Sequence, residues 1–303
     1  MKLLDMNSST GPVGAAPTVG GTQAPMQFLM IVDNPEIGRF VSANGVARLF
    51  IDLEYMGKEE RQKGLGTWKS NHRPADVSRM REAAPDAHLL VRVNPLHDAS
   101  QQEIDDVIAR GADSVMLPMF RDAADVARFL EFVDGRAEPV PLVETATALA
   151  ALPEIAETLP LTRLHIGLND LHLDMGLDFM FQPIADGLLE EPTAALRKAG
   201  IRFGIGGIAR AGEGAVSPEF LLGEHVRLGS DAAILSRTLH RSVSTLAALR
   251  ASMDLPAELR KLQAIYARFL LSSADELERN RDQAADLING IAQDLRTKKG
   301  KQT

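Results

Sequence analysis

The stretch VPLVET, residues 140–145, is a short apolar run that ends in an acid, Glu144, and a helical pattern follows it at 147–158. A strand that leads into a helix is the repeating unit of parallel α/β folds. The same unit recurs on both sides of this stretch. It predicts strands at 28–32, 47–54, 88–94, 114–119, 140–145, 164–169, 203–208 and 232–236.

Segments with helix signals lie between these runs, at 35–44, 74–84, 100–110, 123–134, 147–158 and 218–227. Strands joined by helical crossovers are parallel, which fits a closed eight-stranded barrel or an open doubly wound sheet. The glycine-rich nucleotide signatures of open sheets are missing from the sequence. Eight units favour an α/β protein of the TIM (β/α)8 barrel class.

Three parts are expected along the chain. Residues 1–25 are rich in Gly, Pro, Ser and Thr and read as a flexible leader. The barrel is predicted to occupy 26–245, and 246–303 forms a helical extension. Long helical patterns at 257–270 and 274–295 predict extra C-terminal helices that pack on the barrel or on a second subunit, so a homo-oligomer is expected.

The composition narrows the possible functions. The chain has 303 residues, 45% of them hydrophobic, with a net charge of −8. This acidic balance argues against a nucleic-acid partner, which usually meets a basic surface. Cysteine is absent, and no stretch reaches the ~20 apolar residues of a membrane span. A soluble cytoplasmic protein without a membrane partner is therefore expected.

Arg92 interrupts the apolar run HLLVRVN at 88–94. Side chains alternate along a strand, so Leu90 and Arg92 share one face, which we expect to be the barrel interior. A guanidinium keeps its charge there and needs an anion, either an internal carboxylate or a bound substrate. Asp52 and Glu54 share a face near the end of the second strand, where they either supply that anion or contact water on a metal.

Two further acids stand at strand ends, Glu144 at the carboxyl end of the fifth strand and Asp170 just past the sixth. Each also fits the start of a helix, Glu144 through the helix dipole and Asp170 as an N-cap. Taken together with the inward arginine, however, two hard oxygen ligands from adjacent strands predict a divalent metal site for Mg²⁺, Mn²⁺ or a related ion. A small anionic substrate is expected beside it.

These residues lie within motifs that resemble the HpcH/HpaI aldolase and citrate lyase beta-subunit family. The motifs occur in order between Met26 and Ser236, and they are IDLE at 51–54, VRV at 91–93, GADSVMLPM at 111–119, VET at 143–145 and GLNDL at 167–171 with Gly176. As a set they are far more specific than any one of them.

The resemblance implies a barrel enzyme that forms or cleaves carbon–carbon bonds next to a 2-oxo acid or an acyl thioester. It implies that Glu144 and Asp170 hold the metal and that Arg92 contacts the oxo-acid oxygens and stabilises an enolate. It further implies that backbone amides around Asn169 and Asp170 bind the substrate carboxylate. A chelated divalent ion suits this chemistry, because it acts as a Lewis acid for the enolate.

The chain departs from the family at one catalytic position. The aldolase branch has a histidine base directly after the acid of the second strand, and this chain has Tyr55 there. The candidate replacements are His72, on a long loop at 56–73, and His172, two residues after Asp170. A water on the metal is a third candidate.

The glycine-rich segment after the seventh strand, GGIARAGEG at 206–214, is a second candidate binding patch. Backbone amides near Gly207 and the charge of Arg210 would bind an anion there. The alternative is a turn in which Arg210 pairs with Glu213.

The sequence therefore predicts a metal-dependent lyase of the class II aldolase type that acts on pyruvate or oxaloacetate with a carbonyl acceptor or product. An acyl-CoA lyase is the nearest alternative. Because Tyr55 replaces the histidine, a barrel that has lost catalysis and serves as a binding or scaffold subunit is the alternative from another class.

Overall fold

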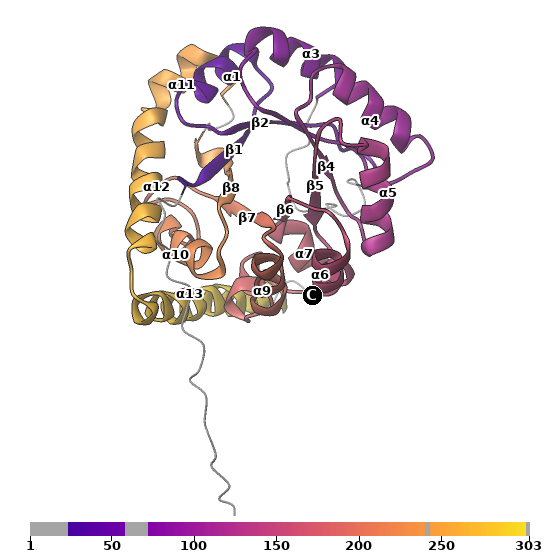
Figure 1. Ribbon diagram of the computed structural model, residues 1–303. Coiled ribbons are helices and arrows are strands. Elements are labelled where there is room, and N and C mark those ends of the chain that lie inside the picture. The colour runs from indigo at the N-terminus through magenta and orange to yellow at the C-terminus, as the bar shows by residue number, and fades with distance from the viewer. Residues whose placement is uncertain (1–23, 58–71, 240–242, 301–303) are drawn as a thin grey trace, which may run out of the picture.

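Eight parallel strands form a closed barrel in sequence order, so the predicted TIM (β/α)8 fold is confirmed (Figure 1). The computed structural model describes residues 24–57, 72–239 and 243–300. The predicted leader and most of the loop at 56–73 lie outside these ranges. The strands are β1 (Gln27–Ile31), β2 (Arg48–Asp52), β3 (Leu89–Arg92), β4 (Ser114–Leu117), β5 (Glu138–Val143), β6 (Arg163–Ile166), β7 (Arg202–Ile208) and β8 (Ala232–Leu235).

Helices surround the barrel and connect its strands (Figure 1). Around the strands lie α1 (Pro35–Ser42), α3 (Pro74–Ala83), α4 (Ser100–Ala109), α5 (Ala123–Val133), α6 (Ala146–Thr158), α7 (Leu168–Asp174), α8 (Gln182–Ala185), α9 (Glu190–Ala199) and α10 (Pro218–Leu228). After β8 come a 3₁₀ turn (Arg237–Leu239), α11 (Leu246–Ser252), α12 (Leu255–Leu270) and α13 (Ala274–Gly300). The two long C-terminal helices match their prediction, whereas the three helices between β6 and β7 were not predicted.

The barrel contains two apolar layers. The inner layer consists of side chains that point to the barrel axis, namely Leu29, Phe50, Leu90, Met116, Val140, Leu142 and Ala232. The outer layer joins the other strand faces to the helices, and Leu89, Val91 and Val93 are part of it. The predicted alternation along the third strand is therefore confirmed: Leu90 lies inside, and its neighbours on both sides face the helices.

The C-terminal helices pack against the outside of the barrel. Helix α12 lies along α10, and α13 crosses α8 and α10 (Figure 1). The α13–α10 contact is close because Gly223 has no side chain: a β-carbon there would lie 2.3 Å from Nδ2 of Asn280. None of the helices in the described part of the chain is long and apolar enough to cross a membrane. The division into 26–245 and 246–303 stays a prediction.

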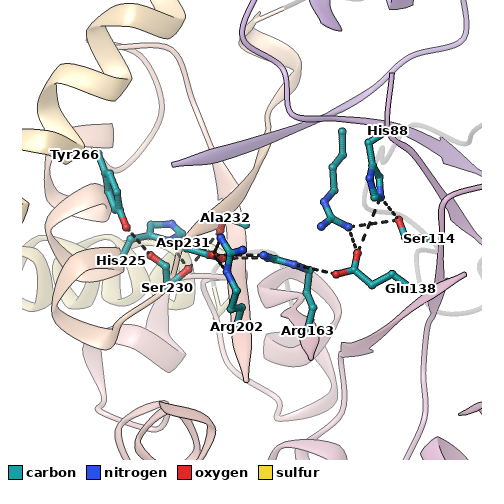
Figure 2. Close-up of polar contacts among 11 residues, drawn as sticks. His88, Ser114, Glu138, Arg163, Arg202, His225, Ser230, Asp231, Ala232 and Tyr266 are labelled. Carbon is teal, nitrogen blue, oxygen red and sulfur yellow. Dashed lines mark hydrogen bonds and ion pairs between the residues drawn. The ribbon is translucent and has the colours of Figure 1, made fainter. Parts of the chain in front are cut away.

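A network of charged side chains closes the amino-terminal end of the barrel (Figure 2). Glu138 pairs with Arg48, and its other oxygen lies 3.5 Å from Nε of Arg163. Arg163 in turn donates from Nη1 to Asp231 at 3.0 Å, and Asp231 also binds Arg202. The Arg48 and Arg163 side chains are below 10% exposed. Buried guanidinium groups need such partners, so the network holds the strand starts together.

We predict that Glu138→Gln lowers the free energy of unfolding by about 2–4 kcal/mol, because it removes one anion from two nearly buried arginines. Urea titration followed by circular dichroism measures this loss. Asp105→Asn is the matched control, since Asp105 pairs with Arg136 at 2.6 Å on an exposed surface and its loss should change stability little. Equal effects of the two variants would contradict a structural role for the network.

Two buried histidines make the stability depend on pH. Burial lowers the pKa of His165 to about 4 and that of His225 to about 3. Below pH 6.5 the unfolded chain takes up protons that the folded chain does not, so stability falls as the pH falls. We expect a loss of about 1.4 kcal/mol per pH unit for each histidine. Urea titrations at pH 7.5, 6.0 and 5.0 measure it, and unchanged stability over this range would contradict it.

Candidate active site

Arg92 points into the carboxyl-terminal mouth of the barrel, as the strand pattern predicts. Its Nε and Nη2 atoms each donate to a different oxygen of Asp52 at 2.8 Å. The Arg92 side chain is 12% exposed, and that of Asp52 is 5% exposed. This bidentate pair fixes the plane of the guanidinium, because both N–H groups must stay aligned with the two carboxylate oxygens.

The third nitrogen of the guanidinium, Nη1, faces two more acids. It lies 3.3 Å from Oε2 of Glu54 and 3.6 Å from Oε1 of Glu144. Below the guanidinium is the Phe50 ring, whose centre is 5.6 Å away. Burial alone would lower the pKa of Arg92. The nearby charges of Asp52 and Glu54 outweigh this effect, so the pKa of Arg92 is raised above its ordinary value. The guanidinium is therefore charged at every pH of interest.

Glu144 follows β5 directly and is 4% exposed. The cap of α6 is the next residue, Thr145, whose hydroxyl accepts from the Ala148 N–H at 3.1 Å. The helix start therefore does not need the Glu144 carboxylate, which turns to the barrel mouth instead. A β-carbon on Gly167 would lie 2.9 Å from Cγ of Glu144, so the glycine leaves room for this side chain beside the start of α7.

Asp170 lies in the first turn of α7 and is 7% exposed. The N-cap of this helix is Gly167, so the alternative in which Asp170 serves as the N-cap is wrong. Strands β5 and β6 are hydrogen-bonded neighbours, which brings Glu144 to the helix that carries Asp170. In the described ranges, no three or more His, Cys, Asp and Glu side chains form a group that could hold a metal. A cation here would take two carboxylates and complete its shell with water or substrate oxygens, as Mg²⁺ commonly does.

Several acids gather at this mouth. Asp52, Glu54 and Glu144 lie around the Arg92 guanidinium, and Asp170 stands at the same end of the barrel. Glu144 and Asp170 offer hard carboxylate oxygens, which are the donors that a divalent ion of the Mg²⁺ type prefers.

The side chain of Tyr55 does not lie inside this site. It is 72% exposed, although its backbone N–H is held by Asn94 Oδ1 at 3.0 Å. Tyrosine therefore does not simply replace the imidazole that the family carries at this position.

His72 bridges the ends of β1 and β2. Its Nδ1 accepts the Asp52 N–H at 3.1 Å, which leaves the ring proton on Nε2 to donate to the Val32 carbonyl at 3.0 Å. Burial lowers the pKa of His72, and the charges of Asp52 and Asp33 only partly offset it. A ring with both nitrogens bonded to backbone groups fits a positioning role better than that of a proton acceptor.

His172 is half-buried on α7, with Nδ1 3.2 Å from the Leu168 carbonyl. Burial lowers its pKa, so the ring is neutral near pH 7 and able to accept a proton. His172 also has a backbone hydrogen bond to Asn169, so its ring is held at the start of α7, on the helix that carries Asp170.

The second predicted patch has a structural explanation. Nη1 of Arg210 lies 3.5 Å from Glu213, and its Nε lies 3.2 Å from Glu258 on α12. Gly207 belongs to β7, where a β-carbon would lie 3.3 Å from the Ile234 carbonyl oxygen. The pairing of Arg210 with Glu213, the alternative that the sequence offered, is therefore present, and Glu258 adds a second partner.

Comparison with known proteins supports the resemblance that the motifs indicate. Residues 75–182, which include Arg92, Glu144 and Asp170, match a family model described as HpcH/HpaI aldolase/citrate lyase. The predicted resemblance to this family is thereby confirmed over these residues, and the matched family consists of lyases and aldolases. A comparison with curated proteins gives no match.

Solved structures with the same fold carry related descriptions. A citrate lyase beta subunit from M. tuberculosis, complexed with oxaloacetate and magnesium, is 19% identical, with a TM-score of 0.54 over 80% of this chain and 97% of that chain. Protein CitE from Mycobacterium tuberculosis, in complex with magnesium and pyruvate, is 17% identical, with a TM-score of 0.56 over 88% and 98%. An HpcH/HpaI aldolase/citrate lyase family protein from Burkholderia cenocepacia J2315 is 17% identical, with a TM-score of 0.56 over 78% and 95%.

We predict that Arg92→Met lowers the free energy of unfolding by about 3–5 kcal/mol at pH 7.5, because it removes the cation that three buried carboxylates share. Urea titration followed by circular dichroism tests this. Arg128→Met is the control, since the exposed Arg128 also lies over an aromatic ring, that of Phe132 at 5.2 Å.

A loss for Arg92→Met that is no larger than that of Arg128→Met would contradict this electrostatic account.

Proposed function

We propose that this protein is a divalent-metal-dependent carbon–carbon lyase or aldolase that acts on a 2-oxo acid such as pyruvate or oxaloacetate. The observation that carries the proposal is the Arg92 guanidinium, which Asp52 holds by two nitrogens while Nη1 faces Glu144 at 3.6 Å. The distances from Nη1 are longer than the roughly 2.8 Å of a strong charge-assisted hydrogen bond. Nη1 is therefore the donor that remains for the oxygens of a substrate anion.

Glu144 and Asp170 are the residues that would hold the cation in this proposal. Bound Mg²⁺ or Mn²⁺ would supply a Lewis acid next to the substrate carbonyl. The magnesium complexes of two structural neighbours, one with oxaloacetate and one with pyruvate, support this choice of ion and substrate class. Asp52 and Glu54 act through Arg92, because they fix its position and keep it charged.

Arg92 has the main chemical role among the chain's own groups. When a proton leaves the carbon next to the carbonyl, negative charge develops on the substrate oxygen, and a guanidinium fixed beforehand stabilises that charge without reorganising. The backbone N–H groups of Asn169 and Asp170 lie in the first turn of α7, where helix N–H groups have no helical partner and bind carboxylates. The bonding of His72 leaves His172 and a bound water as the proton acceptors of this proposal.

Deuterium uptake into the methyl group of pyruvate tests the proposal directly. Proton NMR in heavy water is expected to show exchange with wild type that requires Mg²⁺ or Mn²⁺. Glu144→Gln and Asp170→Asn should each slow it on the order of 100-fold, since several kcal/mol of charge stabilisation would be lost. The control variants Glu154→Gln and Asp186→Asn alter exposed acids on α6 and just after α8 and should exchange like wild type.

Exchange no faster than in buffer, or equal exchange in the Glu144, Asp170 and control variants, would rule out enolate chemistry at this site. Lyase activity on an acyl-CoA thioester without activity on the free oxo acid would replace the proposed substrate with that of the acyl-CoA lyases.

A further inference from the structure

Asn94 lies two residues after Arg92, and its side-chain amide is held from both sides. It is 3% exposed. Its Nδ2 donates to Oε1 of Glu103 on α4 at 2.7 Å, and its backbone N–H donates to the same oxygen at 3.2 Å. A carboxylate only accepts hydrogen bonds, so the NH₂ side of the amide must face Glu103 and the oxygen must face the other way.

The amide oxygen faces the chain that leaves β2. Oδ1 of Asn94 accepts the backbone N–H groups of both Tyr55 and Met56, each at 3.0 Å. We name the Asn94 amide, the Glu103 carboxylate and these two N–H groups the Asn94 clamp. It connects a helix on the outside of the barrel to the segment that directly follows Glu54.

The Asn94 clamp completes a continuous set of bonds at the end of β2. The Leu53 N–H donates to the Arg92 carbonyl at 2.9 Å, and the Glu54 N–H donates to Oδ1 of Asp52 at 3.2 Å. Together with the N–H groups of Tyr55 and Met56, four successive backbone donors are therefore bound. Oδ1 of Asp52 also accepts from Arg92, so the backbone around Glu54 and the guanidinium share one acceptor.

The outer end of the clamp is also fixed. Oε2 of Glu103 lies 3.1 Å from Nε2 of His97. Nδ1 of His97 accepts the Ala99 N–H at 3.1 Å, so the ring proton sits on Nε2 and points at Glu103. Both oxygens of the Glu103 carboxylate are therefore engaged, and the carboxylate has one orientation in which to meet Asn94.

We propose that Asn94 is a positioning residue for the reaction: with Glu103 it fixes the backbone after β2 and so holds Glu54 and Asp52 against Arg92. This inference rests on the proposed function for its catalytic consequence, and on the hydrogen bonds alone for its structural one. A guanidinium that must meet developing charge loses much of its effect when it shifts by about 1 Å. Asn94 touches neither the carboxylates at the metal position nor the Nη1 atom of Arg92 in the described structure.

A charge-swap pair of variants tests the clamp. Asn94→Asp places a carboxylate against Glu103 and removes the donor, so kcat for pyruvate exchange should fall on the order of 10- to 100-fold. The double variant Asn94→Asp/Glu103→Gln restores a donor facing an acceptor, and kcat should return to within about three-fold of wild type. Asn44→Asp is the control, because the side chain of the half-buried Asn44 donates to the Phe40 carbonyl of the preceding helix, α1, at 2.7 Å and lies away from the Asn94 clamp.

Two readouts separate positioning from a general loss of stability. Mn²⁺ affinity should stay within about two-fold of wild type in Asn94→Asp, since Glu144 and Asp170 are untouched, and KM for pyruvate should change less than kcat. The ¹⁵N–¹H signal of Arg92 Nε, identified by its absence in Arg92→Lys, should shift in Asn94→Asp and return in the double variant. Hydrogen exchange of the Tyr55 and Met56 amides should follow the same order.

The NMR and hydrogen-exchange readouts do not need an active enzyme. If wild type does not exchange pyruvate protons, the proposed function fails, and the Arg92 signal and the two amides still decide whether the clamp holds the guanidinium. An Arg92 signal that Asn94→Asp leaves in place, amides that exchange at the wild-type rate, or a double variant no better than Asn94→Asp would each overturn the inference.

Discussion

The guanidinium of Arg92 inside the barrel is the constraint on which the architecture of the mouth depends. It keeps its charge in a region where charge is costly, so anions must surround it. Asp52 meets it with two bonds, and Glu54 and Glu144 lie within ion-pair distance. Glu144, which the proposed function assigns to the cation, is one of these acids. In that proposal the arginine and the metal position are two parts of one electrostatic arrangement.

The two ends of the barrel show what distinguishes a structural charge network from a candidate site. At the amino-terminal end, Arg48 and Arg163 pair with Glu138 and Asp231, with a third arginine, Arg202, on the outside (Figure 2). Each of these arginines has a carboxylate partner. At the carboxyl-terminal end Arg92 stands among acids, two of which the proposed function uses at the metal position or beside it. A barrel of this class uses the amino-terminal end for stability and the carboxyl-terminal end for chemistry.

Much of this arrangement could be predicted from the sequence, because strand geometry is periodic. Alternation alone placed Arg92 on the inner face of its strand and placed Asp52 and Glu54 together on the inner face of theirs. Strand alternation gave a wrong prediction past Ile166, because Leu168 continues the apolar alternation but is the first residue of α7. Leu168 packs closely against Gly206, where a β-carbon would lie 2.7 Å from its Cδ1. The Asn94–Glu103 bond could not be predicted, since it depends on how α4 approaches the end of β2. Neither residue belongs to a motif, and only the folded chain brings them together.

Anomalous scattering from crystals grown with Mn²⁺ and pyruvate tests the central claim most directly, namely that Glu144 and Asp170 hold a divalent cation beside Arg92. The account predicts a single strong manganese peak within bonding distance of Glu144 and Asp170, with pyruvate oxygens at the peak and within hydrogen-bond distance of Nη1 of Arg92. A mouth without manganese, or a peak bound only by other residues, would contradict it.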